Sequence, residues 1–316
     1  MSVLITGATG FIGSHLTRVL LDEDCKVYAL IRNTSNTWRI EDILESLHVI
    51  RGDLLELDGW ERQLQKIRPE ICFHLAWYAE PGEYLTSQEN LNMLTASIRL
   101  ASHLAKLGCK KFISTGTCIE YDTDLGYLSE DSRLKPQSLY AASKLALYLV
   151  LEQFMATVGM DFAWVRLFYQ YGPYEDQRRL IPYIICSLLR NEEAKITKGE
   201  QIRDFLHVED VAAAIWAVSQ SNLSGPVNIG SSRPVSVQDI ATRIGEILNR
   251  PELIKLGALP YSDSEPMFIC ANNSRLKNHT AWVPRYDIEE GLQHTIAWWK
   301  RYLKMKKCSY KDQIVR

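Results

Sequence analysis

A short apolar run followed by a glycine-rich turn opens the chain. Val3-Leu4-Ile5 leads into Gly7, Gly10 and Gly13, and apolar residues at helical spacing follow. In a strand, glycine turn and helix of this order, backbone N–H groups and the positive end of the helix dipole can hold phosphate groups. This context, which an ordinary glycine-rich turn lacks, predicts a dinucleotide site at the first strand–helix unit.

Short β-branched or apolar runs continue to alternate with amphipathic segments through the first half of the chain. The alternation predicts an α/β fold with a doubly wound parallel sheet, covered by helices on both faces. We expect strands near residues 2–6, 26–31, 47–50, 71–75, 111–115 and 161–167, and helices at 11–21, 88–106 and 140–157.

The pattern becomes less regular after Phe168, where turn signals such as Gly172-Pro173 interrupt it. We expect residues 1–168 to form a dinucleotide-binding domain and residues 169–303 to form mainly a smaller, interleaved C-terminal substrate domain. The segment at about 203–230 is expected to return to the main sheet, and a helix is expected at 180–189. The polar and basic residues 304–316 predict a frayed tail.

Charge and cysteine usage narrow the class of protein. A formal net charge of -2 provides no global field for nucleic acid or anionic membranes. The seven cysteines are scattered without paired spacing, which indicates neither a disulfide frame nor a metal site and fits a reducing cytoplasm. The chain opens without a basic leader, and we expect no apolar run long enough to span a bilayer. We therefore expect a cytoplasmic protein without nucleic-acid, membrane or metal partners.

Tyr140 and Lys144 lie one turn apart on the same face of a predicted helix. An ammonium about 4 Å from a phenol stabilises the phenolate by about 4 kcal/mol at an effective dielectric near 20, which would lower the phenol pKa by roughly three units before desolvation opposes it. A phenol tuned in this way can act as a general acid or base near neutral pH.

The spacing Gly-x-x-Gly-x-x-Gly with Tyr-x-x-x-Lys downstream resembles the extended short-chain dehydrogenase/reductase family, whose members modify nucleotide sugars. The resemblance runs from Val3 to Trp299. It implies a Rossmann-type fold, a nicotinamide cofactor and a homodimer built on helices 88–106 and 140–157. It also implies cofactor contacts from Gly7, Thr9, Gly10, Phe11, Ile12 and Gly13, from Asp53, Leu54 and Ala76, and from Tyr140 and Lys144.

Arg32 stands at the end of the second predicted strand, where an acidic residue would bind the adenosine ribose of NAD. An arginine there suits the 2′-phosphate of NADP, so NADP is favoured and NAD stays possible. The alternative is that Arg32 is only solvated. His74, near the end of the fourth strand, is expected to be a packed strand residue.

The resemblance assigns the catalytic threonine to Thr117, four residues before Tyr121, where its hydroxyl would orient the substrate oxygen beside Tyr140. The 4,6-dehydratases of the family carry an Asp-Glu pair after this threonine, whereas Cys118-Ile119 follow here, which disfavours dehydration. Cys118 has either a chemical role or an inert packing role. Substrate contacts are expected from Tyr169, which replaces a family asparagine, and from Arg179 and Arg203.

Arg32 and the missing Asp-Glu pair favour an NADPH-dependent reductase in which Tyr140 donates the proton. The stretch Gly116-Thr117-Cys118-Ile119-Glu120-Tyr121 resembles bacterial keto-sugar reductases, and this resemblance implies a nucleoside-diphosphate 4-keto-6-deoxy sugar as the substrate. The alternative enzyme is an NAD-dependent nucleotide-sugar 4-epimerase or epimerase-reductase. A non-catalytic dinucleotide sensor is a third possibility, but it would have no need to retain Thr117, Tyr140 and Lys144 together.

Overall fold

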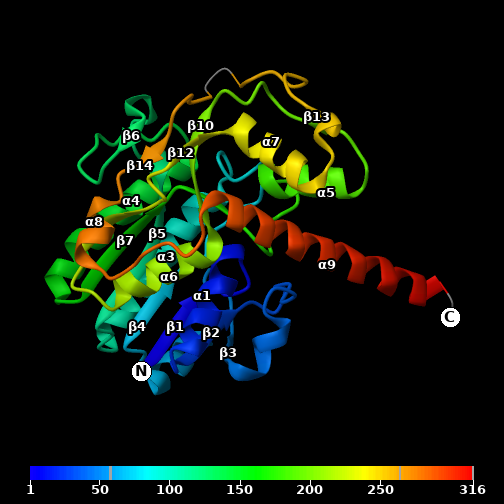
Figure 1. Ribbon diagram of the computed structural model, residues 1–316. Helices are drawn as coiled ribbons and strands as arrows, with labels where there is room; N and C mark the ends of the chain where they lie inside the picture. Colours follow the sequence, from blue (N-terminus) through cyan, green and yellow to red (C-terminus); the bar gives the residue numbers. More distant parts are fainter. Residues whose placement is uncertain (57–58, 263–264, 315–316) are drawn as a thin grey trace.

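The computed structural model describes residues 1–56, 59–262 and 265–314, with side chains to residue 305. Seven parallel strands form the central sheet, in the order β11-β7-β5-β4-β1-β2-β3 (Figure 1). They are β1 (Ser2–Thr6), β2 (Lys26–Ile31), β3 (His48–Arg51), β4 (Ile71–His74), β5 (Lys111–Thr117), β7 (Asp161–Leu167) and β11 (Gly225–Ile229). The predicted α/β fold is confirmed, and β11 brings a late segment back to the main sheet.

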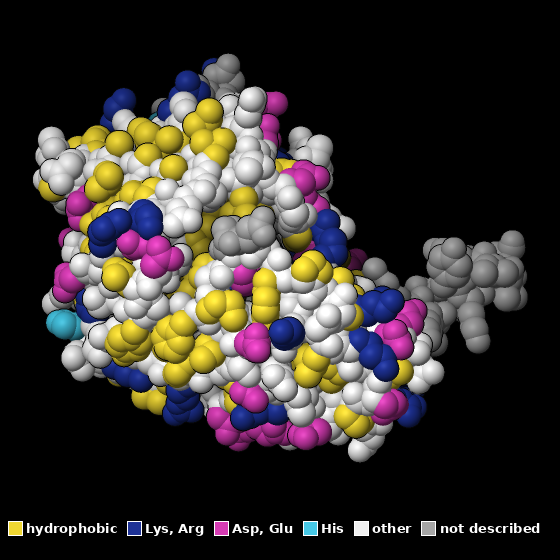
Figure 2. All heavy atoms as spheres, turned by 90° about the horizontal axis from the view of Figure 1, so that it is seen from above, with side chains coloured by type: hydrophobic (Ala, Val, Ile, Leu, Met, Phe, Trp, Pro, Cys, Tyr) yellow, Lys and Arg dark blue, Asp and Glu magenta, His cyan; other side chains and the backbone are white. Residues whose placement is uncertain are grey.

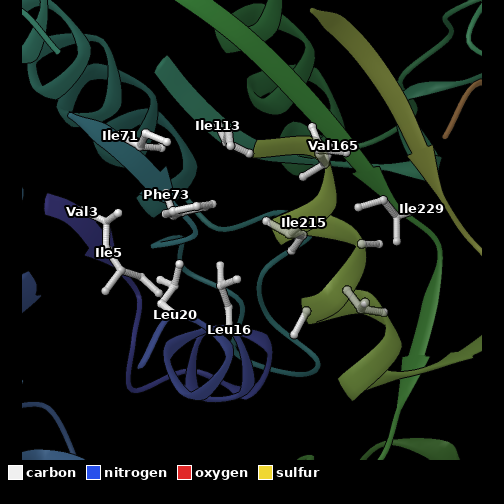
Figure 3. Packing of buried hydrophobic residues seen from close by; sticks show 14 of the residues in the cluster. Val3, Ile5, Leu16, Leu20, Ile71, Phe73, Ile113, Val165, Ile215 and Ile229 are labelled. Carbon is white, nitrogen blue, oxygen red and sulfur yellow. The ribbon is translucent and has the colours of Figure 1, made fainter. Parts of the chain in front are cut away.

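Helices cover both faces of this sheet. On one face, α1 (Phe11–Asp22) and α6 (Val208–Ser219) pack on the strands through an apolar cluster that includes Leu16, Leu20 and Ile215 (Figure 3). A second apolar cluster joins the other face to α2 (Trp60–Ile67), α3 (Glu89–Lys106) and α4 (Leu139–Val158). The strand order reverses between β1 and β4, so the carboxyl ends of these two strands flank the switch point where parallel α/β sheets bind ligands.

The remaining elements form a smaller region beyond the carboxyl ends of the central strands (Figure 1). Its strands are β6 (Tyr127–Leu128), β8 (Tyr169–Tyr171), β9 (Ala194–Lys195), β10 (Ile202–His207), β12 (Pro234–Ser236), β13 (Ile254–Lys255) and β14 (Cys270–Ala271). They pair as β12-β10-β8, β13-β9 and β14-β6. The helices of this region are α5 (Leu180–Leu189), α7 (Val237–Leu248) and α9 (Ile288–Ile314), and its short 3-10 helices are η2 (Cys118–Glu120), η3 (Thr123–Leu125) and η4 (Pro251–Leu253). Two remaining helices are exceptions, because η1 (Glu41–Ser46) and α8 (Ser274–His279) pack against the apolar cluster of the central sheet. A third apolar core joins α5, α7 and α9.

Two expectations about the helices are wrong. The stretch predicted as a frayed tail from residue 304 is helical through Ile314, as part of α9, because no glycine or proline follows Gly291.

The second concerns apolar runs, none of which was expected to be long enough to span a bilayer. By length and composition, α4 is long and apolar enough to do so. Its apolar residues Leu147, Leu151 and Met155 are buried against the sheet and α3, as in a core helix of a globular protein.

Charged side chains of both signs are interspersed with apolar ones on the face shown in Figure 2. This distribution agrees with the formal net charge of -2, and it gives that face no broad area of one sign.

Candidate active site

The β1–α1 turn can be built only with glycine at two positions. Gly7 has a φ of +77°, and a Cβ there would lie 2.7 Å from the backbone nitrogen of Ala76. A Cβ on Gly13 would lie 2.0 Å from the Gly7 carbonyl oxygen. The helix α1 begins at Phe11 with no side chain capping it and no acidic residue in its first turn. Its first N–H groups therefore remain available, and the turn fits the pyrophosphate of a dinucleotide.

The other predicted cofactor residues gather at the same edge of the sheet. Arg32 directly follows β2 and is exposed, while Asp53 and the buried Leu54 follow β3. Ala76 follows β4, and its N–H donates to the Thr6 hydroxyl at 3.3 Å. Their contacts with a cofactor remain predictions.

His74 is a packed strand residue, as expected. Its Nδ1 lies 2.8 Å from the Thr6 hydroxyl and its Nε2 lies 2.8 Å from the Ser97 hydroxyl. Burial lowers the pKa of His74 to about 3, so the ring is neutral at physiological pH.

Tyr140 lies in the first turn of α4, beside the end of β5. Ser138 caps this helix by accepting a hydrogen bond from the Ala141 N–H at 3.1 Å, and the Tyr140 N–H donates to the Leu85 carbonyl at 3.1 Å. The residue is half-buried, and its phenol lies within hydrogen-bonding reach of Thr117. The structure therefore brings the predicted catalytic threonine and tyrosine together.

The expectation that Lys144 lowers the pKa of Tyr140 is wrong for this structure. Burial raises the pKa of Tyr140 above its usual value of 10, and the hydrogen bond with Thr117 opposes that shift only in part. The Lys144 ammonium donates to the Thr115 carbonyl at 2.8 Å and lies 3.9 Å from the centre of the Trp77 ring. Burial also lowers the pKa of Lys144 to about 7, so much of its charge is lost at neutral pH.

The loop after β4 contributes two aromatic residues that the sequence analysis missed. The Tyr84 ring meets the Tyr140 ring edge to face, with centroids 4.9 Å apart, and the Arg179 guanidinium lies 5.3 Å from the centre of the Tyr84 ring. Trp77, which faces Lys144, is fixed by a 2.8 Å hydrogen bond from its Nε1 to Asn90. Arg179 is thereby placed near Tyr140, although 39 positions separate them in sequence.

A buried ion pair underlies Thr117. The Glu120 carboxylate accepts hydrogen bonds from the Thr117 N–H at 2.7 Å, from Trp164 Nε1 at 3.0 Å and from Arg166 Nε at 2.8 Å. In return the Thr117 hydroxyl accepts from the Glu120 N–H, which completes a capping box. Glu120 was not among the predicted residues, although the spacing Thr-x-x-Glu is the sequence signal that could have identified it.

Cys118 is buried, and burial raises the pKa of its thiol to about 12. Because the thiolate is the reactive form, this environment favours the packing role over the chemical role for Cys118.

Two of the residues predicted to contact the substrate, Tyr169 and Arg203, lie together. The Arg203 guanidinium lies 5.3 Å from the centre of the Tyr169 ring, donates to the Ile202 carbonyl at 2.9 Å and forms an ion pair with Glu265. The acidic partner of Arg203 is therefore Glu265 and not its neighbour in sequence, Asp204. Asp204 instead accepts hydrogen bonds from Ser231, Ser232 and Ala271.

One group of possible metal ligands occurs within the described part of the chain, away from these residues. It comprises His207, Glu209 and His294, whose ligand atoms lie within 4.8 Å of one another. His207 Nδ1 accepts a hydrogen bond from the Glu209 N–H at 3.3 Å, which leaves the proton of the neutral ring on Nε2, 3.3 Å from His294 Nδ1. The cluster is therefore satisfied as a hydrogen-bonded cap of α6.

Comparisons with known proteins agree on one family. Residues 3–230 match the model of the NAD dependent epimerase/dehydratase family. The chain is 26% identical to the CDP-abequose synthase of Salmonella typhimurium over 305 residues, which cover 93% of this chain and 97% of that protein.

Solved structures give the same result. The UDP-N-acetylglucosamine 4-epimerase of Methanobrevibacter ruminantium, in complex with UDP-N-acetylmuramic acid, superposes with a TM-score of 0.87 at 27% identity, covering 95% of this chain and 98% of the other. MoeE5 in complex with UDP-glucose and NAD superposes with a TM-score of 0.81 at 29% identity, covering 96% of this chain and 100% of the other.

Proposed function

Since the chain belongs to the NAD-dependent epimerase/dehydratase family, and is thereby an enzyme of the extended short-chain dehydrogenase/reductase type, we propose that it is an NADPH-dependent reductase of a nucleoside-diphosphate 4-keto-6-deoxy sugar. The observation that carries this choice is Arg32, an exposed arginine where an NAD enzyme would present a carboxylate to the ribose. The similarity to a CDP-abequose synthase supports a substrate of the nucleotide-sugar class.

Tyr140 is the proposed proton donor. Burial keeps its pKa above the usual value, so the phenol is protonated at neutral pH and can donate a proton to the oxygen that develops at C4. Thr117 would orient the substrate oxygen, because its hydroxyl is already held by the Glu120 N–H and lies beside Tyr140. Lys144 would bind the nicotinamide ribose through the N–H groups that Thr115 does not use. A nicotinamide dinucleotide over the glycine turn would supply the hydride.

The test is to incubate the purified protein with a panel of nucleoside-diphosphate 4-keto sugars while following NADPH absorbance. At least one keto sugar should be reduced, and Tyr140→Phe should abolish turnover while cofactor binding is retained. Turnover by Tyr140→Phe, or no NADPH oxidation with any member of the panel, would contradict the proposal.

A nucleotide-sugar 4-epimerase is the second candidate, favoured by the superposition on the M. ruminantium 4-epimerase at a TM-score of 0.87. An epimerase retains its cofactor through the catalytic cycle. NAD(H) that co-purifies tightly with the protein would favour this candidate, and freely exchanging NADPH would favour the reductase.

We also propose that the protein is a homodimer through α3 and α4. Both helices expose large apolar side chains, namely Leu91 on α3 and Leu149 and Val150 on α4, each 45–50% accessible in the single chain. Apolar side chains exposed on two adjacent helices would be buried by an equivalent pair from a second copy.

A further inference from the structure

We propose that Arg39 is a second cation for the ribose 2′-phosphate of NADP and a determinant of cofactor specificity. This inference rests on the proposed use of NADPH and adds a residue that the sequence pattern did not indicate. Arg39 follows Arg32 by seven positions, in the loop between β2 and η1.

The Arg39 side chain reaches back to the phosphate-binding turn. Its Nη1 lies 3.5 Å from the carbonyl oxygen of Thr9, in the middle of that turn, and its Nε donates to the Tyr174 carbonyl at 2.8 Å. In a dinucleotide-binding fold the adenosine ribose lies near the end of the second strand, which Arg32 directly follows, and the contact with Thr9 places the Arg39 guanidinium at the neighbouring glycine turn.

Arg39 is half-buried without an acidic partner. Among the described residues no carboxylate forms an ion pair with it, and Asp42 in the adjoining η1 is bound by Arg18 at 2.6 Å. Burial lowers the pKa of Arg39, and Asp176 opposes that shift only from a distance. Its two hydrogen bonds to carbonyl oxygens use two of the five guanidinium N–H groups. A partly desolvated cation with N–H groups to spare is completed by an anion such as a phosphate.

An aromatic cluster holds the loop in place. The Arg39 guanidinium lies 4.7 Å from the centre of the Trp38 ring. Trp38 in turn packs against Tyr174, Trp298 and Tyr302, with centroid distances of 5.5, 6.4 and 5.4 Å. Packing against residues of α9 thus fixes the loop. The Arg39 guanidinium is already positioned and loses little conformational freedom when it binds a phosphate.

Arg39 is also accessible to a ligand. Together with Asn36 and Trp38 it lines an open pocket of about 930 Å³ between its loop and α9, so the guanidinium can be reached from solvent. Four acidic residues also line this pocket, and two of them, Asp42 and Asp176, are paired with Arg18 and Arg178.

The experiment compares Arg39→Ala and Arg39→Lys with the wild-type enzyme, using fluorescence titration to obtain Kd for NADPH and for NADH. The exposed Arg62 on α2 provides the control variant Arg62→Ala. Loss of one charge-assisted phosphate contact should raise the Kd for NADPH about 10- to 100-fold in Arg39→Ala. The Kd for NADH should not change, Arg39→Lys should recover part of the affinity, and the difference should shrink as salt is added.

The outcomes separate the two proposals. If the wild-type enzyme does not prefer NADPH, the proposed cofactor is wrong, and the role of Arg39 is wrong with it. If the wild-type enzyme prefers NADPH and Arg39→Ala keeps that preference, only the role of Arg39 is overturned. Equal weakening of NADPH and NADH would overturn it as well, since that result would show a structural effect on the turn.

Discussion

Replacing Glu120 with glutamine tests whether the buried ion pair beneath β5 holds Thr117, the proposed catalytic threonine, in place. Glu120 is fully buried, and Arg166 is 1% exposed. Glutamine has almost the same shape, but it has one oxygen where the carboxylate has two. Three donors, from Thr117, Trp164 and Arg166, converge on those oxygens, so the new amide NH₂ must face at least one of them.

The expected loss of stability follows from the charge left behind. Removing one partner of a buried ion pair typically costs about 3–5 kcal/mol, because the other charge stays buried and uncompensated. That is a large part of the roughly 5–15 kcal/mol that stabilises an ordinary domain. Arg166 has little capacity to adapt, since its Nη2 already lacks a partner among the described residues and its Nη1 is committed to the Tyr121 hydroxyl at 2.9 Å.

The free energy of unfolding can be measured by urea titration, with tryptophan fluorescence as the signal. We expect Glu120→Gln to lose about 3–5 kcal/mol and the double variant Glu120→Gln/Arg166→Met to recover part of that loss, because no unpaired charge then remains. The folded fraction of Glu120→Gln should bind NADPH normally but turn over at least about tenfold more slowly, because Thr117 is no longer fixed. A loss below about 1 kcal/mol with unchanged turnover would refute the reasoning.

Three further outcomes are expected. Gly13→Ala should abolish cofactor binding, because its Cβ would lie 2.0 Å from the Gly7 carbonyl oxygen. The control Gly108→Asn should leave the Kd for NADPH unchanged, since open space surrounds Gly108. The free energy of unfolding should fall as the pH drops from 6.5 toward 3. The buried rings of His15, His74 and His207 have pKa values of about 4, 3 and 3 in the folded protein, so the unfolded chain takes up their protons first, and each ring contributes about 1.4 kcal/mol per pH unit. The melting temperature of His207→Gln should therefore fall less steeply with acid than that of the wild-type protein. Leu149→Glu/Val150→Glu should convert the proposed dimer to a monomer in light scattering, and an unchanged mass would remove α4 from the interface.

The features that the sequence predicted well depend on spacing along a single element. The glycine turn follows from its spacing between an apolar run and a helix, the strands follow from short apolar runs, and the Tyr140–Lys144 pair follows from the helical period, so none of them needs tertiary information. What the spacing could not give was the environment of those residues. The predicted lowering of the Tyr140 pKa assumed a charged lysine close to the phenol, whereas packing buries the Lys144 ammonium against Trp77 and Thr115.

The features that were missed are contacts between distant elements. Glu120 and Arg166 are 46 positions apart, and Arg203 and Glu265 are 62 positions apart. Glu120 and Arg166 meet because β5 and β7 end at the same edge of the sheet. Arg203 and Glu265 meet because a loop of the smaller region folds over that edge. One sequence could suggest that Arg203 has an acidic partner, but not that the partner is Glu265.

The Arg203–Glu265 pair bears directly on how a nucleotide sugar could bind. Arg203 presents its face to Tyr169 and its edge to the Ile202 carbonyl and Glu265, so the N–H groups suited to a diphosphate are partly occupied. A diphosphate placed beside the Glu265 carboxylate would meet repulsion between like charges. For Arg203 to hold a diphosphate, as the family resemblance implies, Glu265 has to release it. Substrate binding at this arginine is therefore an exchange of one anion for another, and its net free energy is smaller than that of a diphosphate meeting an unpaired arginine.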